Sequence, residues 1–228
     1  GLLSAEILTD EAVMAPVSGQ RQLDRKNLRR ASQLMDEAGW RVNADGMREK
    51  DGQVFTLEVL DSSPAFDRIT NPMIENMKAL GIDARLNRVD TAQESERTRA
   101  YDFDVTTHSM RMGFEPSSGL EQYFGTKAMD QSSRNLMGLS DPAVDALIEK
   151  VVRAQSKAEL NTNIRALDRV LRAKRFWIPQ WFKAVHTVAY YDQYGYPDPL
   201  PPFARGELDF WWFDADKAAK LKAAGVLN

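Results

Sequence analysis

One stretch in the first half of the chain contains two strand patterns separated by one helix pattern. Apolar and polar side chains alternate in residues 54–60 and again in 82–89, a period typical of strands. Between them, residues 64–80 repeat apolar side chains at helical spacing, and Gly81 is a residue favoured at a helix end. A strand, a helix and a second strand predict parallel strands joined by a right-handed crossover. We therefore expect an α/β fold with a mostly parallel sheet flanked by helices.

Further helices and strands are predicted along the rest of the chain. Helices are expected at 27–38, 91–100, 142–154, 158–173 and 214–224, a third strand at 101–108, and aromatic strand candidates at 177–182 and 185–191. The turn pairs Asp45-Gly46 and Asp51-Gly52 predict a surface hairpin after the first of these helices. Residues 1–26 have only weak periodicity, which indicates an irregular lead-in.

The composition excludes several classes of function. The 228 residues include 30 Lys+Arg and 33 Asp+Glu, so a net charge of −3 gives no sign of a nucleic-acid partner or an anionic membrane surface. The absence of cysteine excludes a disulfide scaffold, a thiolate metal site and a cysteine nucleophile. No apolar run approaches the ~20 residues of a membrane span. The first residues lack the charged region of a signal peptide, so we expect any export signal to lie outside this sequence, and we expect no cofactor.

The loop from His108 to Gly119 is the main candidate for ligand contact. It follows the third predicted strand at its carboxyl end, where open α/β sheets place their ligands. It combines one cation, Arg111, and one carboxylate, Glu115, with several hydroxyl groups. The predicted ligand-binding residues are His108, Ser109, Met110, Arg111, Met112, Gly113, Phe114, Glu115, Ser117 and Trp181. A plain surface loop is the alternative.

Two residue pairs resemble catalytic arrangements. Asp102 and Asp104 lie two residues apart in a predicted strand, so they would share one face and could serve acid–base catalysis. A hydrolase could also pair His108 or His186 with a serine such as Ser109. However, the chain contains no G-x-S-x-G motif, and a structural role suits both pairs better. We therefore expect no enzymatic activity.

The hairpin around Asp45 superficially resembles a calcium loop, because Asn43, Asp45 and Glu49 alternate. An EF-hand requires a bidentate glutamate at its twelfth position, and Val54 occupies that position here. The sequence therefore predicts a structural turn and no metal site.

The last third of the chain is rich in aromatic residues, including the adjacent Trp211 and Trp212. If this segment is a strand, both cannot point inward, since neighbouring side chains point to opposite faces. One of them should face a ligand or a partner surface. A protein-interaction module whose residues 211–213 bind a partner is therefore an alternative function.

Two stretches resemble a known family: NLMGLSDPAVDALIEK, which starts at Asn135, and AGWRVNADGMREKDGQVFTLEVL, which starts at Ala38. Both resemble the extracellular solute-binding proteins of ABC importers, family 5, in the oligopeptide- and dipeptide-binding class. The FWWFD sequence at 210–214 is most similar to the Yej-type branch, which transports microcin C and longer peptides. The resemblance extends over residues 27–227.

The resemblance implies a type II, class C periplasmic-binding-protein fold, of which this chain would form the C-terminal lobe. Residues 27–196 would form the ligand-binding lobe, 1–26 would lead in from a missing first lobe, and 197–228 would return to that lobe. The implied function is binding of a peptide or peptide-like solute in a cleft between the lobes. The implied partner is an inner-membrane ABC permease, and the implied location is the periplasm, or the extracellular face as a membrane-tethered protein.

Members of this class carry a tryptophan and, shortly after it, an aspartate in the loop at 108–119. That aspartate holds the amino terminus of the peptide. Aligned on Glu115-Pro116, the two positions are Ser109 and Met112 in this chain. The resemblance therefore does not carry that salt bridge over to this sequence.

Overall fold

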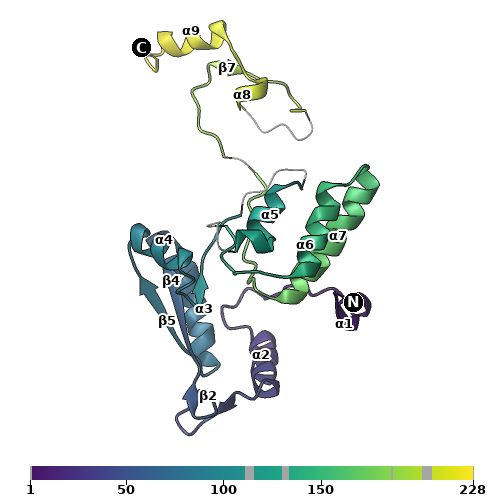
Figure 1. The fold of residues 1–228 in the computed structure, drawn as a ribbon. Helices are drawn as coiled ribbons and strands as arrows, with labels where there is room; N and C mark the ends of the chain where they lie inside the picture. Colours follow the sequence, from purple (N-terminus) through teal and green to yellow (C-terminus); the bar gives the residue numbers. More distant parts are fainter. Residues whose placement is uncertain (1, 111–115, 130–133, 186, 202–206, 228) are drawn as a thin grey trace. The chain divides into compact units, whose positions relative to one another are not determined.

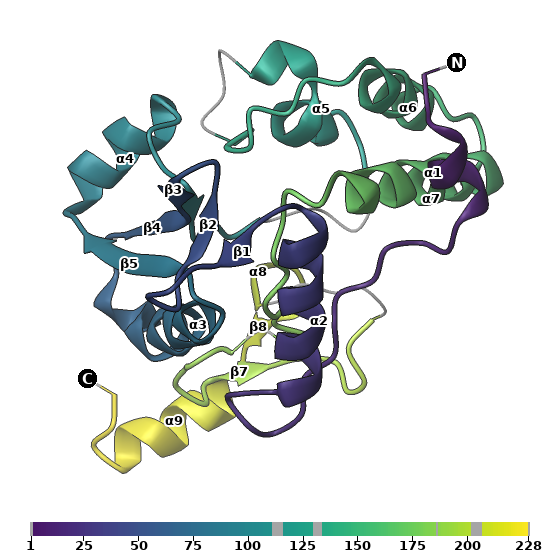
Figure 2. The ribbon, with the colours of Figure 1, turned by 90° about the horizontal axis from the view of Figure 1, so that it is seen from below.

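The structure, a computed structural model, describes residues 2–110, 116–129, 134–185, 187–201 and 207–227. The chain divides into two units, Gly1–Ile178 and Pro179–Asn228, and each is considered by itself. Most of their helices and strands are labelled in Figures 1 and 2. None of the helices in the described ranges combines the length and apolar character that a membrane crossing requires.

The predicted parallel sheet is present in the first unit. It consists of β4 (Thr56–Asp61), β5 (Asp83–Arg88) and β6 (Val105–Thr106), in the order β5-β4-β6. Strands β4 and β5 pair in parallel from Thr56 opposite Asp83 to Asp61 opposite Arg88. The 3₁₀ turn η1 (Pro64–Phe66) and helix α3 (Asp67–Ala79) connect them (Figure 1). The strand–helix–strand prediction is thus confirmed.

Helix α3 covers one face of this sheet (Figure 2). Ile74 on the helix packs with Val59 and Ala84 on the strands, and all three are buried. Burial of an apolar side chain of this size contributes about 1.5–3 kcal/mol. Gly81 then turns the chain from α3 into β5 with φ of +85°, and a Cβ there would lie 2.7 Å from the carbonyl oxygen of Gly46. Only glycine fits this position without displacement.

The predicted hairpin is a three-stranded antiparallel sheet of β1 (Arg41–Val42), β2 (Arg48–Lys50) and β3 (Gln53–Val54). The side-chain oxygen of Asn43 accepts hydrogen bonds from the backbone of Asp45 and Met47, each at 3.0 Å. Its amide nitrogen donates to Glu49 at 2.9 Å. The residues that alternate like a calcium loop therefore hold a turn. Among the described residues, no group of three His, Asp or Glu could hold a metal ion.

Arg48 attaches helix α2 (Arg25–Glu37) to the rest of this unit. Its side chain is 2% exposed. Nη1 donates to Asp36 at 2.6 Å and to the carbonyl oxygen of Trp40 at 2.9 Å, while Nε donates to that of Leu80 at 3.0 Å. A buried guanidinium is stable only when its donors are used. Arg48 therefore joins α2, the hairpin and the end of α3.

The third strand is much shorter than the 101–108 prediction, which was wrong in its length. Strand β6 covers only Val105–Thr106, and Val105 pairs with Val59. The Oδ2 atom of Asp104 accepts a hydrogen bond from the backbone nitrogen of Glu58 at 2.8 Å. A longer strand would have to satisfy this part of β4 with its own backbone. The side chain of Asp104 thus replaces one backbone hydrogen bond of the ladder directly before β6 and limits the strand at its amino end.

The other part of the first unit is helical. Its elements are α1 (Ala5–Thr9), α5 (Gly119–Phe124), the 3₁₀ turn η2 (Thr126–Ala128), α6 (Pro142–Val152) and α7 (Lys157–Lys174). Helix α4 (Thr91–Arg99) lies instead beside the parallel sheet (Figure 1). Helices α6 and α7 lie side by side, and with α5 they bury one apolar cluster that includes Phe124, Val144 and Leu167 (Figure 1). Helix α1 shows that residues 1–26 are less irregular than predicted.

Helix α6 begins at Pro142 and has Asp141 as its N-cap, as the Asp-Pro pair indicates. The carboxylate accepts hydrogen bonds from the backbone of Ala143 and Val144 and pairs with Lys174. Burial alone would raise the pKa of Asp141, but the contact with Lys174 and the two backbone donors outweigh it and lower the pKa below its ordinary value of 3.8. The ionised form is therefore stabilised in the folded protein.

We expect Asp141→Ala to reduce the free energy of unfolding by about 1 kcal/mol at pH 7, because α6 loses its N-cap. Since the folded pKa lies below the unfolded one, this stabilisation is complete above pH 3.8 and disappears as pH falls through the folded value. Urea unfolding at pH 7 and near the acid limit of folding measures the difference. Glu149→Ala, at an exposed position of the same helix, is the control, and an equal loss at both pH values would contradict this account.

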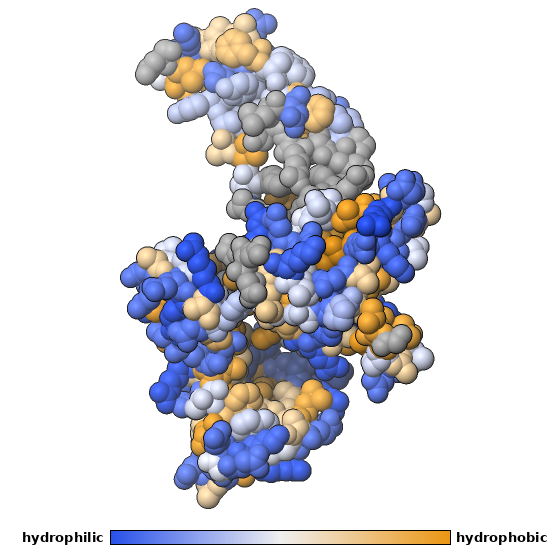
Figure 3. Space-filling view, viewed as in Figure 1, coloured by the Kyte–Doolittle hydropathy of each residue, from blue (hydrophilic) through white to orange (hydrophobic). Residues whose placement is uncertain are grey.

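The strands predicted at 177–182 and 185–191, which lie mostly in the second unit, are absent from the described residues. The described residues of both segments have no regular structure, and Trp181 and Phe182 are 59% and 86% exposed. A strand needs a neighbouring strand to satisfy its backbone, and the described residues provide none for either segment. Apolar alternation alone therefore overpredicted the strands. Apolar residues lie on the visible surface of this unit in Figure 3.

The regular elements of the second unit are β7 (Tyr194–Gly195), α8 (Glu207–Phe210), β8 (Trp212–Phe213) and α9 (Ala215–Ala223). Strands β7 and β8 are antiparallel. Trp211 is partly buried and packs on Tyr190 and Tyr196, with ring centroids 4.5 and 5.0 Å away. Trp212 is 54% exposed. The prediction that one tryptophan of this pair faces outward is confirmed.

Candidate ligand-binding site

The carboxyl ends of three parallel strands meet at one edge of the sheet. Strand β4 ends at Asp61, β5 at Arg88 and β6 at Thr106, and β4 lies between the other two strands. Open α/β sheets bind ligands at this edge, because the connections that leave it diverge to either side. This edge of the sheet is therefore the first candidate for a ligand-binding site.

A buried ion pair stiffens this edge. Asp61 is 2% exposed, and its Oδ1 atom lies 3.2 Å from Nη1 of Arg88 and accepts a 2.8 Å hydrogen bond from the backbone of Ser63. Arg88 also pairs with Asp67 at the start of α3. The other oxygen of Asp61 is buried without a hydrogen-bond partner. Arg88 is therefore the group that makes burial of this carboxylate tolerable.

Helix α4 lies beside the same edge and is attached by polar contacts. Asp90 caps its first turn through the backbone of Gln93 at 2.8 Å. Arg97 reaches Glu58 of β4 at 2.7 Å. The hydroxyl of Ser62 donates to Oε2 of Glu94 at 2.5 Å. No residue of α4 is buried. Since the helix has no apolar face, the side that it turns to the sheet edge remains polar.

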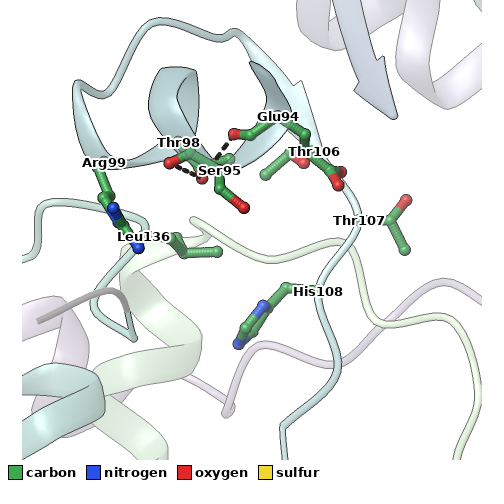
Figure 4. Close-up of a pocket in the computed structure, with 8 residues that line it drawn as sticks. All are labelled: Glu94, Ser95, Thr98, Arg99, Thr106, Thr107, His108 and Leu136. Carbon is green, nitrogen blue, oxygen red and sulfur yellow. Dashed lines mark hydrogen bonds between the residues drawn. The ribbon is translucent and has the colours of Figure 1, made fainter. Parts of the chain in front are cut away.

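An open hollow of about 260 Å³ lies between α4, the end of β6 and the segment at 134–139 (Figure 4). Its lining residues are Glu94, Ser95, Thr98, Arg99, Thr106, Thr107, His108 and Leu136. Burial lowers the pKa of His108 below its ordinary value, so the imidazole is neutral at pH 7. The hollow thus offers one carboxylate, one guanidinium and several hydroxyl groups to a polar ligand.

Asn135 fixes the apolar side of this hollow. It is fully buried, its amide nitrogen donates to the carbonyl oxygen of Leu139 at 2.9 Å, and its oxygen accepts from the Leu139 nitrogen at 2.9 Å. The hydroxyl of Tyr101, just after α4, donates to the carbonyl oxygen of Asn135 at 3.0 Å. These bonds close a tight loop and hold Leu136 toward the hollow (Figure 4).

The predicted site residues have different outcomes. His108 lines the hollow, and Ser109 and Met110 follow it as irregular chain. Ser117 precedes α5, and Trp181 belongs to the second unit. Arg111, Met112, Gly113, Phe114 and Glu115 lie outside the described residues. The assignment of these residues to a ligand therefore stays a prediction.

Sequence reasoning missed most of the residues that line the hollow. The sequence indicated only that the residues on α4 belong to a charged helix. Leu136 lies in a motif that was interpreted only as the start of the next helix. One signal was available: a helix next to a parallel sheet normally carries an apolar face, and residues 91–99 have none. The side that such a helix turns toward a strand end is a candidate for binding.

The catalytic alternatives do not gain support from the geometry. Asp102 lies outside the strand and pairs with Arg97 at 2.8 Å, and Asp104 caps the backbone of Glu58. The prediction that these two carboxylates share one face of a strand was therefore wrong. His186 lies outside the described residues.

Comparison with known proteins places this chain in a family. Residues 9–131, more than half of the chain, match the model of the bacterial extracellular solute-binding proteins, family 5, in its middle part. The chain belongs to this family. Family 5 membership agrees with the resemblance seen in the sequence.

Two relatives show how much of a family 5 protein this chain represents. It is 40% identical over 213 residues to the uncharacterized protein y4wM of Sinorhizobium fredii, covering 92% of this chain and 32% of the relative. It is 38% identical over 209 residues to the probable peptide-binding protein YejA of Agrobacterium fabrum, covering 91% and 34%. The chain thus spans about one third of the length of these relatives.

A solved structure shows the same fold. The oligopeptide-binding protein AppA of Bacillus subtilis, in complex with a nonapeptide, matches with a TM-score of 0.57 and 18% sequence identity. The match covers 74% of this chain and 36% of AppA. The periplasmic-binding-protein-like α/β fold, with a parallel sheet flanked by helices, is therefore confirmed.

Proposed function

We propose that this chain is the C-terminal lobe of a receptor that binds a peptide or peptide-like solute and delivers it to an ABC permease of the inner membrane. The polar hollow at the carboxyl edge of the sheet, in a chain 38% identical to a probable peptide-binding protein, carries this proposal. The receptor would act in the periplasm or, tethered to a membrane, at the cell surface. The resemblance of residues 210–214 to the Yej-type branch supports microcin C-like compounds as one class of solute.

Binding in such a receptor makes and breaks no covalent bond. A ligand that contacts both lobes stabilises the closed form of the receptor over the open one. The permease would then distinguish the closed form from the open form. The hollow described above supplies only one side of such a cleft, so this chain alone should bind weakly. We assign residues 27–196 to the ligand-binding lobe, and 1–26 and 197–228 to its connections with the first lobe. The exposure of Trp181, Phe182 and Trp212 supports a partner surface of this kind.

A mass measurement on the complete protein tests the proposed function. The receptor is purified without denaturation, stripped, exposed to a mixture of peptides of two to six residues, and analysed by native mass spectrometry. We expect one peptide to be retained per protein and to be released intact. Cleaved peptides would support the hydrolase alternative, and no retention from any peptide mixture would contradict peptide binding.

The loop at 108–119 provides a second test. Arg111 is the only cation in that loop. A charged hydrogen bond to the ligand contributes about 1.5–3 kcal/mol, so Arg111→Ala should weaken peptide binding about tenfold or more in the complete receptor. Calorimetry measures the change, and Arg165→Ala, at an exposed position of α7, is the matched control. Equal affinities for both variants would remove Arg111 from the site.

A further inference from the structure

We propose that the hollow beside α4 binds a short zwitterionic peptide, with Glu94 holding its ammonium group and Arg99 its carboxylate. This inference rests on the proposed function and narrows it from peptides in general to those whose two charged ends lie close together. It assigns ligand contacts to helix α4, which the predicted site at 108–117 did not include.

Glu94 carries a negative charge that the protein leaves uncompensated. Its side chain is half-buried in the wall of the hollow, and one of its oxygens accepts the hydroxyl of Ser62. Across the described residues, Glu94 forms no ion pair with a lysine, arginine or histidine. A partly desolvated carboxylate is stabilised by a nearby cation, because the field of the charge is screened less there than in water. The remaining oxygen can therefore accept the ammonium group of a ligand.

Arg99 carries the opposite charge and is similarly unused. Its neighbour Arg97 contacts two carboxylates, Glu58 and Asp102. Arg99, in contrast, lines the hollow without an acidic partner in the described part of the chain. A guanidinium presents its donors in a planar fork that matches both oxygens of a carboxylate. Glu94 and Arg99 thus differ from Arg97, whose ion pairs attach the helix to the rest of the fold.

The spacing of Glu94 and Arg99 along α4 limits the size of the ligand. They lie five positions apart, so their backbones are separated by a rise of about 7.5 Å along the helix axis. The close-up shows them on different sides of the hollow, with Ser95 and Thr98 between them (Figure 4). The volume of about 260 Å³ is near the lower end of the ~300–1,000 Å³ range of small-ligand sites. A dipeptide, with one polar amide between its charged ends, fits both the spacing and the hydroxyl lining.

The test uses the complete protein and a mixture of dipeptides in three forms: with both ends free, acetylated at the amino end, and amidated at the carboxyl end. Titration by native mass spectrometry gives an apparent affinity for each form. We expect the free form to bind at least tenfold more tightly than either blocked form. Glu94→Gln should weaken binding of the free and amidated dipeptides about tenfold and leave binding of the acetylated dipeptide unchanged. Arg99→Gln should weaken binding of the free and acetylated dipeptides and leave binding of the amidated dipeptide unchanged.

Matched variants and a longer peptide separate the possible outcomes. Glu96→Gln on the same helix and Arg165→Gln on α7 remove an exposed charge of each sign and should change no affinity. If the unaltered protein binds hexapeptides but no dipeptide, or if both variants keep the full discrimination, this inference is wrong and the proposed function stands. If only one variant loses discrimination, the assignment of the other residue is wrong. If no peptide of any length binds, the proposed function fails and the inference with it.

Discussion

Replacing Arg88 by methionine is expected to lower the free energy of unfolding of the first unit by about 3 kcal/mol. Arg88 is the cation beside Asp61, which is 2% exposed and already has one oxygen without a hydrogen-bond partner. Removal of the guanidinium leaves a buried carboxylate without compensation, and that costs more than the loss of the pair itself. Because 30% of the Arg88 side chain is exposed, water offsets part of the effect, and we expect the lower end of the usual range.

Urea unfolding, with amide exchange at Val59 and Leu60 as a local probe, measures this loss. Arg85→Met is the matched control on the same strand, because Arg85 is 77% exposed and pairs with Asp83 at the surface. Exposed pairs contribute about 0–1 kcal/mol. A second variant, Arg88→Met with Asp61→Asn, removes the uncompensated charge and should recover part of the loss. Similar losses for Arg85→Met and Arg88→Met would show that the buried pair is not what holds this edge.

Arg48→Met should cost the same unit about 3 kcal/mol, for a different reason. The methionine fills part of the space but leaves the carbonyl oxygens of Trp40 and Leu80 without their donor, and each unsatisfied buried group costs about 1–3 kcal/mol. Asp36 is not the problem, since 41% of its side chain is exposed. The loss should concentrate on α2, which Arg48 attaches.

Hydrogen exchange separates this local effect from a global one. Amides of α2 and of the hairpin should exchange faster in Arg48→Met, while those of α6 and α7 change little. Arg41→Met is the control, because Arg41 is 72% exposed and only approaches Asp36 at 3.6 Å. If the exchange of all helices rises equally, Arg48 stabilises the unit as a whole and does not act as an anchor for α2.

The sheet could be predicted because its pattern is local. Residues 54–89 show the period of each element and a glycine at the turn, and each of these signals acts within a few residues. The incorrect strand predictions have a common cause, which is the pairing of each strand with a neighbour. The strand predicted at 101–108 is shortened at its amino end by the side chain of Asp104, and the segments at 177–191 have no neighbouring strand among the described residues. Alternation shows that a segment can form a strand, but its partner decides whether it does.

The candidate site was only partly predictable. The position of His108 after a parallel strand followed from topology, and the structure places it in the hollow. The roles of Asp61 and Asn135 could not be predicted, because burial of a polar side chain depends on partners that are distant in sequence. The same holds for Glu94, whose contact with Ser62 spans three intervening elements, η1, α3 and β5. The sequence pattern therefore predicted which edge of the sheet carries the site. The chemical groups at that edge depend on tertiary contacts, which the sequence pattern does not show.

The polar attachment of α4 has a consequence for the behaviour of the sheet edge. A helix that buries no residue can tilt or fray without exposing apolar surface to water. Its movement is opposed by contacts such as those from Arg97 to Glu58 and from Ser62 to Glu94. Dissolved salt screens such charged contacts, but it does not weaken the apolar packing of α3. Ionic strength should therefore loosen the wall of the hollow before it affects the sheet beneath.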